Sequence, residues 1–421
     1  MDIEKVFKGR MYIDGELRYA EVGVTDGKIV AVGSLVRNGD EVVELGSSDV
    51  MLPSFMDPHV HFRDPGMTSK EDFSTGTLAA LHAGVTCVLD MPNTKPPVTD
   101  VSTIMEKKRA VRGRAFVDYG LFAAVTPNIN AGMIAPLVPG FKLFMGSTTG
   151  NILLNDDEEM LPAVRDVLAT GKRLSVHAED DSMISRDVEN ATRDHLRNRP
   201  AEAEWNAVRR LADNFSGSNI NICHVSSAPT LDIAKAAGFT TEVTLHHMLF
   251  DVDKCPSAYY KTNPPIRDSA SREALYARFL EGGFTMFGTD HAPHTIEDKE
   301  QEFDAAPGGI PGVETTMPIV MNMVRNATIP LSQAVSMGAT NPNEAFGIRK
   351  GRIAVGYDAD FCIFDLRRSS TIDVRKLHSK CQHSPYGGWE AVFPDTVLIR
   401  GELQVKDGEF CGERSGVDIC G

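Results

Sequence analysis

The chain has 421 residues, and 43 Lys and Arg against 58 Asp and Glu give it a formal net charge of −15 at pH 7. This length allows one large domain and a smaller one. The acidic balance argues against a nucleic-acid-binding protein, which needs a basic surface. No apolar run approaches the ~18–20 residues of a membrane helix. We therefore expect a globular protein with neither a nucleic-acid nor a membrane partner.

The seven cysteines are scattered, and no two of them form a C-x-x-C pair. Free thiols are typical of a reducing compartment, whereas a disulfide framework is typical of secreted proteins. The first ten residues, MDIEKVFKGR, are charged and lack the apolar segment of a signal peptide. These features predict a cytoplasmic protein.

Both ends of the chain have the pattern of short strands joined by tight turns. Residues 1–52 contain the turn pairs Asp14-Gly15 and Asp26-Gly27, which favour β-hairpins. Residues 346–421 have the same character, for example in GRIAVGYDADFCIFDL. We expect the two terminal segments to form one small β-sandwich domain together.

Residues 53–345 alternate short apolar runs with helical stretches. Strands are expected at 84–92, 117–125, 140–146, 173–179, 219–227, 240–249 and 284–293, and helices at 101–113, 157–171 and 201–215. The helix at 157–171 is expected to hold Pro162 in its first turn, where proline is tolerated. Repeated β-then-α order predicts a parallel sheet, and the length suits a (β/α)₈ barrel of the TIM type. A doubly wound open sheet is the alternative fold.

The stretch DPHVHFRDP, residues 57–65, places polar side chains on alternate positions. On a strand, side chains alternate between faces, so His59, His61 and Arg63 share one face. Imidazole nitrogens suit zinc and similar divalent ions. Taken alone, the pattern fits a polar surface strand equally well.

The other expected strands also end in polar side chains that suit a metal site, namely Lys142, His177, His224 and Asp290. Each has a structural explanation when taken singly, such as a hydrogen-bonded core histidine or, for Asp290, a helix N-cap. The carboxyl ends of barrel strands converge on one rim, where active sites are built. Together these residues predict a metal centre at that rim.

Lys142 is the unusual member of this set, because an ammonium group cannot bind a cation. Burial in apolar surroundings favours the neutral amine of a lysine, and a neutral amine can add CO₂ to form a carbamate. This anion has two oxygens and can bridge two metal ions. A centre of that kind keeps a net positive charge, which attracts an anionic substrate and polarises an amide carbonyl. Asp156 or Asp157 is the alternative bridging ligand if Lys142 is unmodified.

Eight motifs occur in order between about residues 50 and 347: DPHVHFRDPG, MPNTKPP, FKLFMG, HAE, HVSS, NPPIR, GTDHAPHT and GGIPGVET. With these motifs, and with HSPYGGWE near its C-terminus, the chain resembles the dihydroorotases of the amidohydrolase superfamily. Some relatives carry an aspartate in place of the lysine. This chain resembles the carbamate type, which includes the hydantoinase branch.

The resemblance implies two divalent metal ions, which we expect to be zinc. His59, His61 and Asp290 would bind the first ion, His177 and His224 the second, and carboxylated Lys142 both. Asp290 would also carry a proton from the bridging hydroxide to the leaving ring nitrogen.

The resemblance also implies a set of substrate contacts. Arg63 and Asn93 would clamp the substrate carboxylate, a role suited to the guanidinium fork. The remaining contacts would come from His61, Asn263, His294 and the backbone near Gly308 and Gly309.

The implied reaction is the reversible cyclisation of N-carbamoyl-L-aspartate to (S)-dihydroorotate, the third step of de novo pyrimidine synthesis, with a homodimer as the implied assembly. An allantoinase or a dihydropyrimidinase (hydantoinase) is the closest alternative. Its substrates lack the ring carboxylate, and relatives of that kind usually lack Arg63 and the MPNT loop. A non-catalytic scaffold is the other alternative, against which the intact set of ligands argues.

Several further histidines lie outside the predicted set of metal ligands. We assign His82, His195, His378 and His383 to structural or surface positions, whereas the pair His246-His247 ends an expected strand and is a candidate neighbour of the site. Two glycine-containing loops, 146–156 and 296–312, are candidates for lids over the site.

Overall fold

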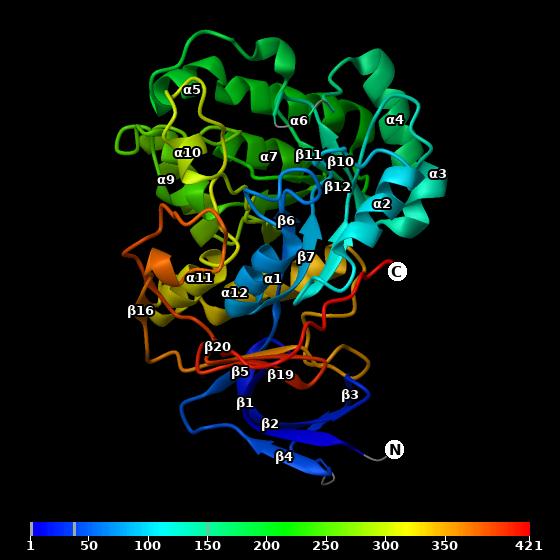
Figure 1. Ribbon diagram of the computed structural model, residues 1–421, viewed down its shortest axis with the longest axis vertical. Helices are drawn as coiled ribbons and strands as arrows, with labels where there is room; N and C mark the ends of the chain where they lie inside the picture. Colours follow the sequence, from blue (N-terminus) through cyan, green and yellow to red (C-terminus); the bar gives the residue numbers. More distant parts are fainter. Residues whose placement is uncertain (1–2, 37–38, 149, 151) are drawn as a thin grey trace.

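The computed structural model describes residues 3–36, 39–148, 150 and 152–421. A large helix-covered part lies above a smaller part made of strands, and the chain begins in the smaller one (Figure 1). Over the described ranges, we find no helix with both the length and the apolar character needed to cross a membrane. All seven cysteines are unpaired.

The large part is built on parallel strands that follow one another in chain order. They are β6 (Phe55–Val60), β7 (Val85–Asp90), β8 (Asp118–Leu121), β9 (Ala123–Ala124), β10 (Gly140–Phe144), β11 (Arg173–His177), β12 (Ile220–Ile222), β13 (Thr240–Val243) and β14 (Met286–Phe287). Only Phe122 separates β8 from β9, so these nine strands occupy eight positions. A parallel bridge between Val60 and His291 joins the last position to the first. The ring is closed, which confirms the predicted barrel and excludes the open sheet.

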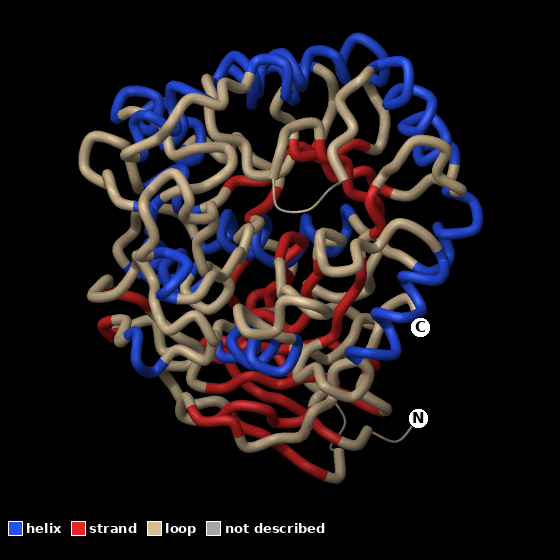
Figure 2. The backbone as a smooth tube through the Cα atoms, turned by 45° about the horizontal axis from the view of Figure 1, so that its top comes forward, coloured by secondary structure: helices blue, strands red, loops and turns tan. Residues whose placement is uncertain are grey.

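Helices surround this ring, as Figure 2 shows. Those between or after the barrel strands are α1 (Phe73–His82), α2 (Val101–Val111), α3 (Ala131–Ile134), α4 (Asp157–Ala169), α6 (Ala201–Phe215), α7 (Ala228–Ala236), α9 (Ser269–Leu280), α11 (Thr316–Arg325), α12 (Leu331–Val335) and α13 (Asn341–Ala345). Three further helices lie in loops of the same part, namely α5 (Thr192–Asn198), α8 (Leu245–Leu249) and α10 (Ile296–Lys299). The longest, α6, buries residues spaced three or four apart, among them Ala207 and Leu211. This spacing puts one apolar stripe against the barrel.

Two local predictions were wrong. Pro162 is the sixth residue of α4 and therefore lies beyond its first turn. The helix tolerates this proline because its start is well stabilised: the Asp156 side chain accepts from Glu158 N at 2.8 Å, and acidic residues fill the first turn. The expected strand at 240–249 ends at Val243, and the rest forms α8.

The small part is a sheet that combines both ends of the chain. Its strands run in the order β20 (Glu409–Phe410), β19 (Glu402–Lys406), β18 (Thr396–Ile399), β15 (Phe361–Phe364), β5 (Val50–Pro53), β1 (Lys5–Ile13), β2 (Glu16–Thr25) and β3 (Lys28–Gly33), with β4 (Glu41–Glu44) also paired to β1. The contact between the two ends is the antiparallel pair of β5 and β15. Two further short strands, β16 (Ser370–Thr371) and β17 (Glu390–Ala391), pair with each other. The predicted β domain of two terminal segments is confirmed, while its boundaries at 52/53 and 345/346 stay predictions.

The turns of this sheet follow the Asp-Gly pairs. Asp14 and Gly15 have φ of 52° and 93°, and Asp26 and Gly27 have φ of 49° and 70°. Positive φ at both central residues is typical of the type I′ hairpin turn, which matches the twist of the flanking strands. The sequence therefore sets where β1 turns into β2 and β2 into β3.

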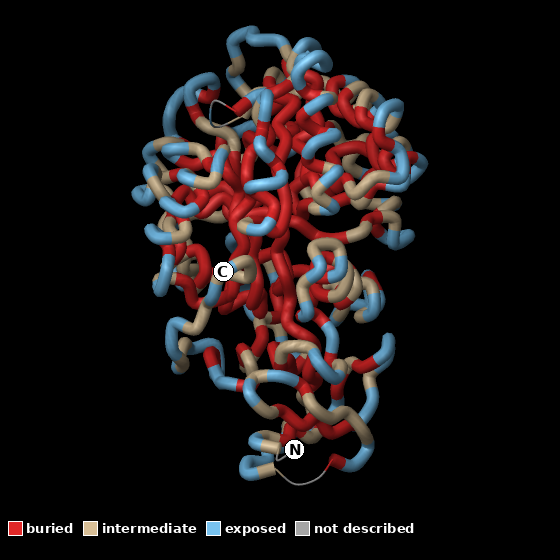
Figure 3. The backbone as a smooth tube through the Cα atoms, turned by 90° about the vertical axis from the view of Figure 1, so that its right-hand side faces the viewer, coloured by how far each residue is buried: buried red, intermediate tan, exposed pale blue. Residues whose placement is uncertain are grey.

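A buried cluster of charges ties the small part to the barrel. Lys350 Nζ lies 2.8 Å from Asp118 of β8, 3.1 Å from Asp358 and 2.6 Å from Asp360. Arg400 pairs with Asp118 from the β18–β19 turn. Buried backbone continues from the barrel into the small part (Figure 3). Because these charges are removed from water, each depends on the others for compensation.

We expect Lys350→Met to lower the free energy of unfolding by roughly 3–5 kcal/mol, because it leaves buried carboxylates without their shared cation. The measurement is the denaturant midpoint followed by circular dichroism. Lys406→Met removes an exposed lysine of β19 and is the control, with an expected change within about 0.5 kcal/mol. Equal midpoints for the two variants would contradict the role of this cluster.

Candidate metal centre

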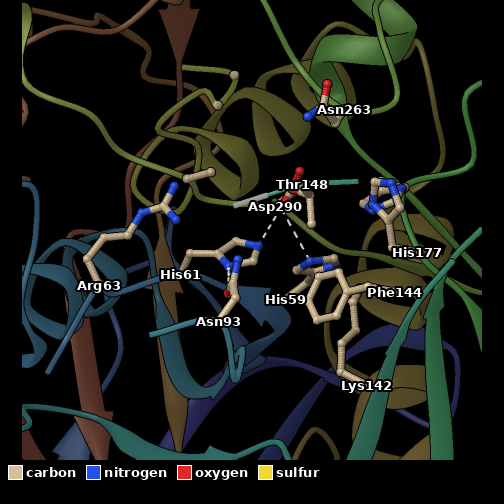
Figure 4. A pocket seen from close by; sticks show the side chains of 14 residues that line it. His59, His61, Arg63, Asn93, Lys142, Phe144, Thr148, His177, Asn263 and Asp290 are labelled. Atoms are coloured by element: carbon tan, nitrogen blue, oxygen red, sulfur yellow. Dashed lines mark hydrogen bonds and ion pairs between the residues drawn. The ribbon is translucent and has the colours of Figure 1, made fainter. Parts of the chain in front are cut away.

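One cavity at the carboxyl ends of the barrel strands collects the predicted site residues. Its lining includes His59, His61, Arg63, Asn93, Lys142, His177, His224, Asn263, Asp290, Gly308 and Gly309. Figure 4 shows Asp290 between Arg63 at one end of the cavity and His177 at the other. Every predicted metal ligand lines this cavity, as does every predicted substrate contact except His294.

His59, His61 and Asp290 form one compact group. The Oδ1 atom of Asp290 lies 3.3 Å from His59 Nε2 and 2.9 Å from His61 Nε2. The first two residues come from the end of β6 and the third follows β14, and the bridge that closes the barrel makes these strands neighbours. Two donor atoms bound to one zinc ion lie ~3.3 Å apart at tetrahedral geometry. The group is therefore spaced to hold one ion.

His177 and His224 form the second group. Their facing atoms, His177 Nδ1 and His224 Nε2, are 3.0 Å apart, a separation that again suits two ligands of one ion. The other ring nitrogen of His224 is buried and has no hydrogen-bond partner among the described residues. His224 has a φ of 36°, an unusual conformation for a residue with a side chain. The chain keeps this conformation where it turns the imidazole into the cavity.

Oxygen atoms behind the histidines determine which ring nitrogen faces the cavity. The three pairs are His59 Nδ1 with Glu242 Oε2 at 2.9 Å, His61 Nδ1 with Asn93 Oδ1 at 2.7 Å, and His177 Nε2 with Glu179 Oε2 at 2.8 Å. Because these oxygens accept, the nitrogens facing them donate. The opposite nitrogen of each ring then presents a lone pair to the cavity, which is the arrangement that orients histidine ligands in metalloproteins.

For His61 and Asp290, burial and charge favour the protonation states that a metal ligand needs. Burial lowers the pKa of His61 to about 3, so its imidazole is neutral at physiological pH. Burial alone would raise the pKa of Asp290, but the neighbouring His59 and His61 hold that pKa well below its usual range. A neutral imidazole and an ionised carboxylate are both competent to bind a cation.

Lys142 lies at the floor of the cavity on β10 and is completely buried. Its Nζ is 2.9 Å from Cys223 Sγ, and none of the described carboxylates lies within ion-pairing distance of it. The alternative bridging ligands are elsewhere: Asp156 caps α4, and Asp157 pairs with Arg210 on the surface. Of these three candidates, Lys142 alone lines the cavity.

Arg63 occupies the other end of the cavity and is 2 % exposed. Its Nε donates to Pro293 O at 3.4 Å, and its Nη2 lies 3.2 Å from His294 Nε2. Within the described ranges no acidic side chain forms an ion pair with it. A buried guanidinium without an acidic partner is a favourable place for an anion, especially a carboxylate.

His294 stands behind Arg63 rather than at the cavity surface. Its Nε2 donates to Gly308 O at 3.0 Å, and its Nδ1 is 3.0 Å from Lys70 Nζ. Two histidines that we had assigned to structural positions support the same region. His195 Nε2 lies 2.9 Å from Asn263 Oδ1, and His383 Nε2 donates to His294 O at 3.0 Å.

Glu179 and Glu242, the carboxylates that orient the histidines, were not predicted from the sequence. Glu179 belongs to the HAE motif but received no role, and Glu242 lies within the apolar run of β13. A signal was present, because a charged residue inside a buried strand needs a partner. Its partner could be found only once β13 was placed opposite His59.

The histidine pair His246-His247 does not line the cavity. His246 and His247 are on α8, where His247 contacts Thr244 Oγ1 at 2.8 Å and Pro264 O at 3.0 Å.

Of the two predicted lids, the first includes residues 149 and 151, which lie outside the described residues, although Thr148 lines the cavity. The second carries Gly308 and Gly309 to the cavity wall. Lid movement stays a prediction for both.

The chain matches a known protein family and resembles proteins of known activity. Residues 50–403 match the amidohydrolase family. A dihydroorotase of Thermoplasma acidophilum is 34% identical over 421 residues, covering 100% of this chain and 99% of that protein. A dihydroorotase of Archaeoglobus fulgidus is 36% identical over 423 residues, covering 97% and 100%.

Solved structures agree on the fold. L-hydantoinase (dihydropyrimidinase) from Arthrobacter aurescens superposes with a TM-score of 0.90 at 24% identity, covering 98% of this chain and 99% of that one. Dihydropyrimidinase from Brevibacillus agri superposes with a TM-score of 0.88 at 27% identity, covering 99% and 98%. At 24% identity, the first of these likenesses supports the fold alone, that is, the barrel with its attached β domain.

We expect Glu242→Gln to weaken divalent-metal affinity by about 10- to 100-fold, because the amide holds the His59 tautomer less well than the carboxylate. Metal content after competition with a chelator measures this. Glu21→Gln, which changes a buried glutamate of the small sheet, is the control and should keep wild-type affinity. Unchanged affinity in Glu242→Gln would show that this contact does not orient a ligand.

Proposed function

Because the chain belongs to the amidohydrolase family, we propose that it is a dihydroorotase, which interconverts (S)-dihydroorotate and N-carbamoyl-L-aspartate in de novo pyrimidine synthesis. One observation carries this proposal: a single cavity combines a rim of potential metal ligands with a buried cation, Arg63, that has no acidic partner among the described residues. The hydrolysed bond is a cyclic amide, and the substrate also bears a carboxylate. The cavity offers a separate place for each.

We propose that two zinc ions occupy the rim. His59, His61 and Asp290 would hold one, and His177 and His224 the other. Bound there, the ions would polarise the ring carbonyl and acidify the attacking water. The nitrogen-rich donor set favours zinc over harder ions.

Lys142 would bridge the ions as a carbamate. A buried ammonium without a counter-ion is costly, and no described carboxylate pairs with Lys142 Nζ. Loss of one proton from the ammonium gives the neutral amine, and addition of CO₂ to this amine gives the carbamate anion and releases a second proton. The two histidine groups would then lie around a negatively charged bridge.

Asp290 is placed to move the proton. Its Oδ1 lies at the centre of the cavity, 2.9 Å from His61 Nε2. In hydrolysis it accepts a proton from the attacking water and delivers it to the ring nitrogen as the carbon–nitrogen bond breaks. In the reverse direction the amide nitrogen of N-carbamoyl-L-aspartate loses that proton, and water leaves.

Arg63, Asn93 and Asn263 would fix the orientation of the substrate. The guanidinium and the amide of Asn93 suit a carboxylate, with the Asn93 oxygen already bonded to His61. At Gly309 the backbone passes close to Ala292, because a Cβ there would meet Ala292 O at 2.3 Å.

An allantoinase or hydantoinase activity is the second candidate, and the likeness to solved dihydropyrimidinases favours it. Those substrates are cyclic amides or ureides without a ring carboxylate. They would leave Arg63 buried and unpaired in the complex, at a cost. A non-catalytic scaffold is disfavoured by the complete donor set. We further propose a cytoplasmic homodimer, on the basis of the family resemblance and the free cysteines.

We expect the wild-type chain to turn over dihydroorotate and to be far less active on allantoin, hydantoin and dihydrouracil. Arg63→Ala should lower kcat/KM for dihydroorotate by about 30-fold or more, as expected for truncating one partner of a buried charge pair at roughly 2–5 kcal/mol. It should not harm any residual activity on dihydrouracil. A wild-type preference for an uncharged ring would refute the proposal.

We expect Lys142→Ala to bind less than the wild-type metal content and to lose most activity. A glutamate side chain is three atoms shorter than a carbamylated lysine, so Lys142→Glu tests whether a negative charge from β10 can hold metal without the full reach of the carbamate. Metal analysis of both variants, with mass spectrometry of the wild type for an added CO₂, measures the outcome. Full metal content in Lys142→Ala would exclude the bridging role.

A further inference from the structure

Lys299, at the end of α10, is a buried cation that the proposed chemistry does not use. It is 2 % exposed, and its Nζ donates to Pro307 O at 3.0 Å and to Gly309 O at 2.9 Å. Across the described part of the chain, no carboxylate oxygen pairs with it. Its neighbour in sequence, Asp298, is engaged with Lys70 at 2.9 Å. Burial of an unpaired ammonium is costly unless a further anion compensates it.

The two carbonyls that Lys299 binds flank Gly308, which lines the cavity. In a trans peptide the N–H points away from the C=O. With the Pro307 carbonyl turned toward Lys299, the Gly308 N–H lies on the opposite side of that peptide. It has no partner among the described residues. Gly308 O in turn accepts from His294 at 3.0 Å, and Gly309 N donates to Lys261 O at 2.8 Å.

The segment 307–309 is thus held from behind by cationic or donor side chains. Lys299 and Arg63 contribute two buried positive charges to this wall, and neither has an acidic partner in the structure as described. Burial, followed by repulsion from Lys261 and Arg63, lowers the pKa of Lys299 to about 7, so an anion bound nearby would favour its charged form. The chain as a whole is acidic, at −15, so an anionic ligand needs a local positive potential to enter.

We propose that Lys299 is a specificity-determining positioning residue, which holds the Pro307–Gly309 segment and supplies positive charge behind the subsite for the substrate carboxylate. This inference rests on the proposed function for the identity of the substrate. It extends the subsite beyond Arg63 and Asn93. Lys299 does not touch the reacting atoms, and its effect is on binding rather than on turnover.

A second buried lysine, Lys261, differs from Lys299 in how its charge is compensated. It is also buried and also binds backbone, with Nζ donating to Phe303 O at 2.9 Å. However, it has a carboxylate partner in Glu189 at 3.0 Å. Its charge is compensated within the chain, whereas that of Lys299 is left for a ligand.

The test compares two ligands that differ only in a carboxylate, orotate and uracil, by calorimetric titration of the metal-loaded enzyme. Lys299→Met should weaken orotate binding about tenfold or more, as loss of a nearby charge in a partly buried site implies, and leave uracil binding unchanged. With dihydroorotate as substrate, KM should rise by a similar factor while kcat changes less than about threefold. Lys406→Met, on the exposed face of β19, should match the wild type in every measurement.

Lys299→Gln and Lys299→Arg separate charge from hydrogen bonding. The glutamine variant keeps donors and should behave like Lys299→Met, whereas the arginine variant should recover orotate affinity. Equal losses for orotate and uracil, equal impairment of all three variants, or a wild type that binds orotate no better than uracil would each overturn the inference. If the wild type shows this preference for orotate but does not turn over dihydroorotate, the proposed function fails while the role of Lys299 stands.

Discussion

Closure of the parallel barrel is the constraint on which the site depends. Parallel pairing sends all the strands in one direction, so their carboxyl ends meet at one rim. The closing bridge, Val60 with His291, lies next to Asp290 and His61, and His61 N donates to His291 O at 2.8 Å. An open sheet would hold Asp290 far from the histidines of β6. The closed ring puts their atoms within 3.3 Å.

Compensation of buried polar groups then determines what each residue at the rim can do. Three imidazoles have an oxygen behind them, so each presents a lone pair to the cavity. Three cations, Lys142, Arg63 and Lys299, have no acidic partner among the residues described. In a folded chain such charges are costly. We interpret them as positions at which the carbamate and the substrate carboxylate supply the missing negative charge.

Stability and function are largely separate in this molecule. The ion cluster around Lys350 joins the barrel to the sheet at the opposite end from the rim, and its positive and negative groups satisfy one another. The apolar core of the barrel offsets the cost of the polar groups at the rim. A change in the Lys350 cluster should therefore alter stability, whereas a change at Lys299 should alter ligand binding.

By itself, the sequence determined the alternation of strands and helices, the Asp-Gly turns of the small sheet, and the residue types at the strand ends. These follow from periodicity, turn chemistry and ligand chemistry, all of which are local. Only the tertiary structure decided which side chains stand behind the ligands. Glu242 of β13 meets His59 of β6 across 183 positions, and Lys299 meets a segment that folds back from residue 307. Packing also decided that residues 240–249 form the strand β13 followed by the helix α8 instead of one continuous strand. The reason is that hydrogen-bond partners distant in sequence leave no periodic signal, since they are chosen by the closure of the barrel rather than by neighbouring residues.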